Sequence, residues 1–81
     1  MASRCLHELC SGEKALIAHL SGPEDIRRRL MDVGFTPGSV VECLYKSAWG
    51  DPTAYRIRDT VMALRREDAA HISVVRSEGE L

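Results

Sequence analysis

The chain has 81 residues, a length that predicts one small domain with a single hydrophobic core. Its 11 Lys and Arg residues stand against 12 Asp and Glu, for a formal net charge of −1, whereas general binding to nucleic acid or anionic membranes needs a clear basic excess. No apolar run approaches the roughly 18 residues of a membrane span. We therefore expect one domain over residues 1–76, followed by a polar tail over 77–81.

The first ten residues predict an approach segment and no signal peptide. Arg4, His7 and Glu8 interrupt any apolar stretch, and no small-residue cleavage site follows. Leu6 and Leu9 are spaced so that both can pack against the core. The cysteines are odd in number, so a disulfide framework is not expected. These features predict a cytoplasmic protein.

The next stretch predicts a strand followed by a helix. Residues 14–20 (KALIAHL) have apolar side chains at both odd and even positions, as in a strand with one face buried and the other partly covered. Pro23 fits the first helical position, where its missing N–H is no loss. Ile26, Leu30 and Val33 then form an apolar stripe at helical spacing, which predicts the buried face of the helix.

A glycine and a tight turn end this helix. Gly34 stands where a helix needs a left-handed residue after its last turn, and Phe35 can fold back on that turn. Pro37 and Gly38 supply the fixed φ and the positive φ of a type II turn. From Ser39 onward the residues alternate as in a strand.

The remainder of the chain predicts short strands separated by turns. In order, we expect a strand with Val41, Cys43 and Tyr45 on one face, a turn at Gly50, Asp51 and Pro52, a strand over 53–57, a break at Asp59–Thr60, a strand over 61–64, a helical turn over 65–70 and a strand over 71–75. The sum is a mainly β fold of five strands, with a helix inserted between strands 1 and 2 and a helical turn before the last strand. Strands spaced this closely predict a small barrel, whose closure removes exposed edges.

No motif in the sequence predicts catalysis. A Gly-rich phosphate loop, HExxH, GxSxG and CxxC are all absent from the sequence. Several carboxylates stand instead at expected helix starts, where the helix dipole favours them: Glu24, Asp25, Glu67 and Asp68. We therefore expect a protein that is not an enzyme and holds no cofactor.

One cluster has metal-like spacing. Cys5, His7 and Cys10 form C-x-H-x2-C, but a structural zinc site needs four ligands, usually in two closely spaced pairs. The fourth ligand would have to come from across the fold, from Cys43, His19 or His71. A lone cysteine more often serves as a small apolar residue, so we predict no metal requirement, and a free-standing metal-binding protein is the alternative.

Two features are candidates for partner contact. Arg27 and Arg28 lie on the polar side of the expected helix, although such a run is more often a solvated face. Trp49, the single tryptophan, lies in a loop beside Asp51 and Pro52, and exposed tryptophans are enriched at interfaces. A tryptophan that covers the end of a small barrel is the structural alternative. We expect Trp49 to be the anchor, with Arg27, Arg28 and Asp51 contributing charge.

The ordered set of these residues resembles the ferrous iron transport protein A (FeoA) family. The resemblance runs from about Leu6 to Val75 and is carried by Arg29-Leu30, Gly34-Phe35, Pro37-Gly38, Val41, Gly50-Asp51-Pro52, Ala63-Leu64-Arg65, Ala69, Ile72 and Val74. The chain departs from the family's pattern in one loop and one turn. Asp59 stands in place of a common glycine, Thr60 in place of an aromatic residue, Ala48 in place of a proline, and Trp49 in place of an aliphatic residue or Phe.

The resemblance implies a barrel like an SH3 domain with a helical insertion. It also implies a small cytoplasmic accessory protein that acts on the cytosolic G-protein domain of a FeoB-type ferrous iron transporter. Such an adaptor binds no nucleic acid and reaches the membrane only through the transporter. The alternative is a stand-alone SH3-like domain, related to the C-terminal domain of iron-dependent repressors, that acts in metal-responsive regulation.

Overall fold

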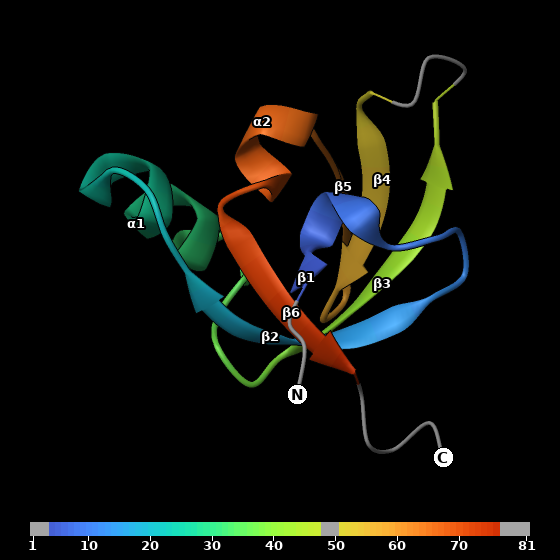
Figure 1. The fold of residues 1–81 in the computed structure, drawn as a ribbon, viewed down its shortest axis with the longest axis horizontal. Coiled ribbons are helices and arrows are strands. Elements are labelled where there is room, and N and C mark those ends of the chain that lie inside the picture. The colour runs from blue at the N-terminus through green and yellow to red at the C-terminus, as the bar shows by residue number, and fades with distance from the viewer. Residues whose placement is uncertain (1–3, 48–50, 77–81) are drawn as a thin grey trace.

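The computed structural model describes residues 4–47 and 51–76 as one antiparallel sheet with short helical insertions. The elements are β1 (Arg4–Cys5), the 3-10 helix η1 (Leu6–Glu8), β2 (Lys14–Leu20), α1 (Glu24–Asp32), β3 (Val40–Lys46), β4 (Thr53–Ile57), β5 (Thr60–Leu64), α2 (Arg66–Ala69) and β6 (Ile72–Arg76). The strand order is β1-β6-β2-β3-β4-β5, and the sheet bends strongly around a common interior (Figure 1).

The mainly β prediction is confirmed, but the predicted number of five strands is wrong, because the described sheet has six. The additional strand, β1, pairs Arg4 with Val74 and Cys5 with Ser73 of β6. It escaped prediction because two residues are too few to show the period-2 alternation of a strand. The inserted helix α1 therefore follows the second strand of the structure.

The core forms where this bent sheet closes on the N-terminal segment. Leu6 and Leu9 are fully buried, which confirms that both leucines pack against the core. The remaining core side chains come from every larger element: Ala15, Ile17, Leu30, Phe35, Val41, Cys43, Tyr55, Ile57, Leu64, Ala69, Ile72 and Val74. Among the described residues, no helix is long and apolar enough to cross a membrane.

Helix α1 begins one residue later than predicted. Pro23 has an extended ψ of 149°, and its carbonyl accepts the first helical hydrogen bond from the N–H of Arg27 at 3.0 Å. Pro23 is therefore the N-cap residue and does not occupy the first helical position. Leu30 is buried and Ile26 packs against the core, but Val33, the C-cap residue, remains 38% exposed.

The end of α1 is closed by two backbone hydrogen bonds across a glycine. Gly34 has a φ of 119°, its N–H donates to the carbonyl of Met31, and the N–H of Phe35 donates to the carbonyl of Leu30. This pattern is a Schellman motif, which satisfies helix carbonyls that would otherwise lack a donor.

The turn that follows Phe35 leads the chain into β3. The N–H of Ser39 donates to the carbonyl of Thr36 at 3.1 Å, and Gly38 has a φ of 91°. These values describe a type II turn with Pro37 and Gly38 in its two central positions.

Strand β3 departs from regular alternation near its end. Val41 and Cys43 are fully buried, but Tyr45, expected on the same face, is 62% exposed. The pairing register with β4 shifts between them, so that Cys43 lies opposite Tyr55 and Tyr45 lies opposite Ala54. An extra residue in one strand reverses which face the following side chains occupy, and this bulge turns Tyr45 outward.

The turn between β4 and β5 also differs from the expectation. Its two central residues are Arg58 and Asp59, because Ile57 pairs directly with Thr60. The positive φ of this turn, 56°, is at Arg58, although the common glycine of the family's pattern corresponds to Asp59. Arg58 is also the one non-glycine residue with a positive φ in the described part of the chain.

Candidate functional site

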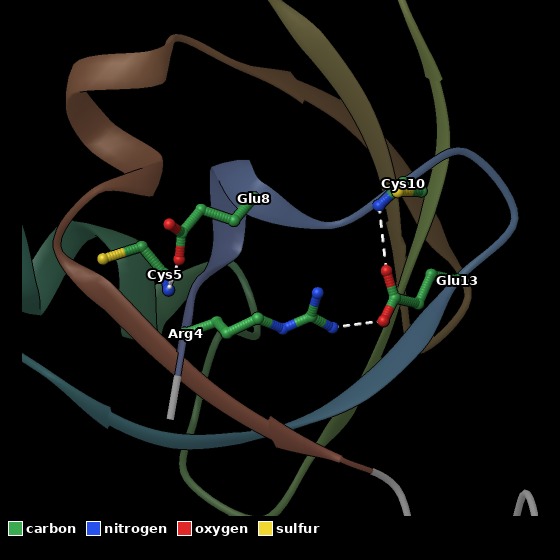
Figure 2. Close-up of polar contacts among 5 residues, drawn as sticks. All are labelled: Arg4, Cys5, Glu8, Cys10 and Glu13. Atoms are coloured by element: carbon green, nitrogen blue, oxygen red, sulfur yellow. Dashed lines mark hydrogen bonds and ion pairs between the residues drawn. The ribbon is translucent and has the colours of Figure 1, made fainter. Parts of the chain in front are cut away.

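Each cysteine of the C-x-H-x2-C segment donates a backbone hydrogen bond to a carboxylate three residues further along the chain. The backbone N–H of Cys5 donates to Glu8 at 2.8 Å, and that of Cys10 donates to Glu13 at 2.9 Å. Figure 2 shows Cys5 and Cys10 at opposite ends of the segment, with an ion pair between Arg4 and Glu13 in the space that separates them. Within residues 4–47 and 51–76, no three His, Cys, Asp or Glu side chains are grouped so that they could hold a metal ion.

The pKa values of Glu13 and Cys43 are shifted in opposite directions. The N–H of Cys10 and the Arg4 guanidinium both stabilise the Glu13 carboxylate, and together they lower the pKa of Glu13 below its ordinary value. Burial has the opposite effect on Cys43, because desolvation disfavours a thiolate and raises the pKa of this thiol. Cys43 is therefore a protonated core residue at neutral pH, in a condition that does not favour metal ligation.

The arginine face of α1 is partly engaged within the protein. The Nε of Arg27 donates to the carbonyl of Gly22 at 3.1 Å, so Arg27 closes the start of its own helix. Arg28 forms a 2.8 Å ion pair with Glu24 one turn earlier, and both side chains are about 70% exposed. An exposed pair of this kind contributes only about 0.3–0.5 kcal/mol, so Arg28 can exchange Glu24 for a partner's carboxylate at little cost.

The candidate loop is tied to α2 through Asp51. The Asp51 carboxylate accepts a 2.8 Å hydrogen bond from the N–H of Arg66, the first residue of α2, and the Asp51 N–H donates to the hydroxyl of Ser47 at 3.0 Å. Pro52 accepts a hydrogen bond from the N–H of Ser47 at 3.1 Å. Trp49 lies outside the described residues, as does Gly50. Asp51 therefore has a structural contact that its place in the sequence did not reveal.

A separate site lies on the outer face of the sheet, the side of β2, β3 and β4 that points away from the core. In the register of the sheet, Lys14 of β2 lies opposite Glu42 of β3, and Glu42 lies opposite Arg56 of β4. Arg56 in turn lies opposite Val61 of β5. Arg56 also forms a 3.5 Å ion pair with Glu42. Three charged residues far apart in sequence thus form one row across β2, β3 and β4, with the apolar Val61 beside it on β5.

This row is one wall of an open groove with a volume of about 480 Å³, which we call the basic groove. Its lining residues are Lys14, Ser39, Val40, Glu42, Arg56 and Arg58. The Arg58 guanidinium donates to the hydroxyls of Thr36 at 3.3 Å and Ser39 at 3.5 Å, and these contacts hold it beside the type II turn. The strand register that brings these cations together cannot be read from the sequence.

The shape of the sheet indicates the class of domain to which the chain belongs. A strongly bent antiparallel sheet of this size, with short helical insertions, is typical of SH3-like β domains. The FeoA domain model matches residues 4–76, and the chain belongs to this family of ferrous iron transport proteins.

One relative links this domain to a transporter in a single polypeptide. A Fe(2+) transport protein A/Fe(2+) transporter FeoB fusion protein of Porphyromonas gingivalis is 39% identical over 69 residues. The match covers 85% of this chain but only 8% of that much longer protein.

Solved structures support the fold. A FeoA-like protein from Clostridium acetobutylicum has a TM-score of 0.86 at 28% identity, with 94% of this chain and 88% of that chain covered. The FeoA of Stenotrophomonas maltophilia, described as a prokaryotic SH3 domain protein in complex with zinc, has a TM-score of 0.79 at 28% identity and covers 89% of each chain. Part of a manganese-dependent transcriptional repressor has a TM-score of 0.83 over 93% of this chain and 42% of that one. At 20% identity, this last likeness concerns the fold alone.

Proposed function

We propose that this protein is a cytoplasmic accessory of ferrous iron uptake that binds and modulates a FeoB-type transporter by protein–protein contact. The observation that carries the proposal is the fusion relative, in which a domain 39% identical to this chain is joined to FeoB. Fusion holds two modules at a high effective concentration, and a separate chain reaches the same contact by binding. The target would be the transporter's cytosolic G-protein domain, and the accessory would act through contact without catalysis of its own.

For the contact residues we keep the hypothesis drawn from the sequence. Trp49 would be the anchor, because interface energy concentrates in a few Trp, Tyr and Arg side chains. Arg27 and Arg28 would steer association, since charges at the rim of an interface act mainly on the association rate. Asp51 would take part through its position in the same loop, where its carboxylate already holds the start of α2.

The experiment that tests this proposal is calorimetric titration of the full chain against the transporter's isolated cytosolic domain, with GTP and with GDP. We expect saturable binding that Trp49→Ala weakens by roughly 2 kcal/mol or more. Arg27→Glu combined with Arg28→Glu should slow association and reduce its salt dependence. Circular dichroism of each variant controls for folding. Absence of binding to the domain in both nucleotide states would contradict the proposal.

The stand-alone regulator is the alternative function. It is favoured by the fold shared with repressors such as the manganese-dependent one, and that likeness is confined to the fold. The same titration separates the two functions, because a regulator that acts elsewhere should not recognise the transporter's cytosolic domain.

A further inference from the structure

We propose that the basic groove is a binding site for an extended acidic segment of a partner protein. This proposal rests on the proposed function in one respect, which is that the partner is the transporter. It is independent of the Trp49 loop and the α1 arginines, because β2, β3 and β4 supply most of the groove.

The groove carries an excess of positive charge, which favours an acidic ligand. Lys14, Arg56 and Arg58 face one carboxylate, Glu42, whereas the chain as a whole carries a net charge of −1. Glu42 forms an ion pair with Arg56. Within the described residues, Lys14 and Arg58 also line the groove but form no ion pair with a carboxylate. A concave surface with excess charge of one sign attracts and orients ligands of the opposite sign.

Spacing and apolar contact favour an extended peptide over a single small anion. Lys14 and Arg56 lie on either side of β3, with their backbones about 9–10 Å apart, and an anion placed midway would meet the negative charge of Glu42, which lies between them. Carboxylates on alternate residues of an extended chain are about 7 Å apart, within reach of both long side chains. Val40 in the groove and Val61 beside Arg56 are 47% and 54% exposed and offer contact to intervening apolar side chains.

The backbone at Arg58 is a further observation that distinguishes this site. A positive φ of 56° is unfavourable for a non-glycine residue, and glycine would adopt it freely. The chain instead has an arginine there, whose guanidinium is held on the groove by Thr36 and Ser39. Unfavourable backbone conformations often coincide with functional positions, and a cation at the groove gives this one a purpose.

The central carboxylate argues against nucleic acid as the occupant. Glu42 lies between Lys14 and Arg56 in the row, and its side chain is 25% exposed. A continuous phosphate backbone would meet this negative charge in the middle of the site, whereas nucleic-acid affinity depends on neutralising successive phosphates. An acidic peptide with alternating apolar residues can place an uncharged side chain there.

The test uses capped peptides of alternating Glu and Val, with a Gln–Val peptide of the same length as the uncharged probe. Heteronuclear NMR of the full chain should show the Glu–Val peptide shifting Lys14, Val40 and Arg56 at low salt, and the Gln–Val peptide should bind at least about fivefold more weakly. Lys14→Gln combined with Arg58→Gln should remove this preference. Arg29→Gln deletes one exposed cation of α1 outside the groove and serves as the control that retains the preference.

Arg58→Gly keeps the test independent of folding. Glycine adopts the positive φ of this turn, so the variant should melt close to the wild type yet lose affinity for the Glu–Val peptide. The proposal is overturned if the two peptides bind equally, if the shifts lie outside the groove, or if a single-stranded oligonucleotide binds there more tightly than the acidic peptide. It is also overturned if deleting residues 77–81 shifts the groove signals without added peptide, since the chain's own acidic tail would then be the occupant.

Failure of the groove and failure of the proposed function give different results. If the Glu–Val peptide binds the groove but the transporter's cytosolic domain does not bind the protein, the groove stands and the proposed partner is wrong. If the cytosolic domain binds but the acidic peptide shows no preference, the function stands and the groove proposal is wrong. Competition between peptide and domain for the same resonances would support both.

Discussion

The backbone N–H of Phe35 donates a 3.1 Å hydrogen bond to the carbonyl of Leu30, and both side chains are buried in the core. One contact therefore ends helix α1 and fixes the direction in which the chain enters the turn before β3. The φ of 119° at Gly34 makes this reversal possible. The relation between the helix and the sheet depends on these three residues.

Replacing Gly34 should destabilise the fold through the backbone. Space exists for a side chain, because an added Cβ would lie 3.5 Å from Ile57, in ordinary contact. The φ is nevertheless unfavourable for a β-branched residue, and Gly34→Val should lower the free energy of unfolding by about 1–3 kcal/mol. Gly34→Asn, which tolerates positive φ better, should lose less. Urea denaturation of both variants checks this, and a wild-type midpoint for Gly34→Val would refute it.

Truncating Leu30 should destabilise the fold through the core. Leu30 is 3% exposed, and Leu30→Ala removes buried methyl groups that its neighbours cannot fully replace. Such substitutions cost about 2–5 kcal/mol, a large share of the stability of so small a domain. Met31→Ala, on the adjacent but 38% exposed position, is the matched control and should change the unfolding midpoint little. Similar midpoints for the two variants would contradict the assigned burial.

Asp51 offers a prediction that separates structure from binding. Its carboxylate accepts the N–H of Arg66 at the start of α2, so Asp51→Ala should lose about 1–2 kcal/mol of stability. Asp51→Asn retains an acceptor oxygen and should remain close to the wild type. Thermal melts followed by circular dichroism measure the difference. If both variants melt alike, the hydrogen bond to Arg66 contributes nothing measurable.

The success and failure of the sequence predictions have a common physical cause. Gly34, Pro37 and Gly38 act on their own φ and ψ, so their turns could be predicted from residue type alone. Asp51 could not be assigned to α2, because its partner Arg66 lies 15 residues away and only tertiary structure brings them together. Tyr45 was misplaced for the same reason, since the bulge before it depends on pairing with β4.

The basic groove is the feature that the sequence alone could least predict. Lys14, Glu42 and Arg56 belong to three different strands, and the sequence does not contain the register that aligns them. The sequence predicts a break at Asp59 and Thr60, but the pairing of Ile57 with Thr60 places the turn at Arg58 and Asp59 and gives Arg58 the positive φ. Local chemistry thus predicted turns and strands, and long-range pairing determined the candidate site.

The N-terminal segment should hold its structure without a metal ion. Glu8 and Glu13 already satisfy the backbone N–H groups of Cys5 and Cys10. We therefore expect Cys5→Ser combined with Cys10→Ser to melt like the wild type, and we expect tag-free wild-type protein to contain no stoichiometric zinc. Elemental analysis beside thermal melts provides the measurement. A lower melting temperature together with release of one equivalent of zinc would show that the prediction is wrong.

Tyr55 should make the protein sensitive to alkali. Its side chain is 1% exposed, its hydroxyl lies 3.5 Å from the carbonyl oxygen of Leu6, and burial raises the pKa of Tyr55 to about 12. In the unfolded chain this pKa is about 10, so the unfolded state releases the phenolic proton first. The contribution of Tyr55 to stability is therefore complete below pH 10 and is lost progressively as the pH rises toward 12.

The difference between the two pKa values corresponds to about 2–3 kcal/mol, which sets the size of the expected effect. Urea denaturation at increasing pH should show the wild type losing this stability above pH 10, whereas Tyr55→Phe, with no proton to release, should lose less over the same range. Tyr45→Phe removes a hydroxyl from a side chain that is 62% exposed and should follow the wild type. If the curves for wild type and Tyr55→Phe run parallel up to pH 12, the Tyr55 hydroxyl does not ionise differently in the folded and unfolded states. The alkaline loss would then belong to other groups that all three proteins share.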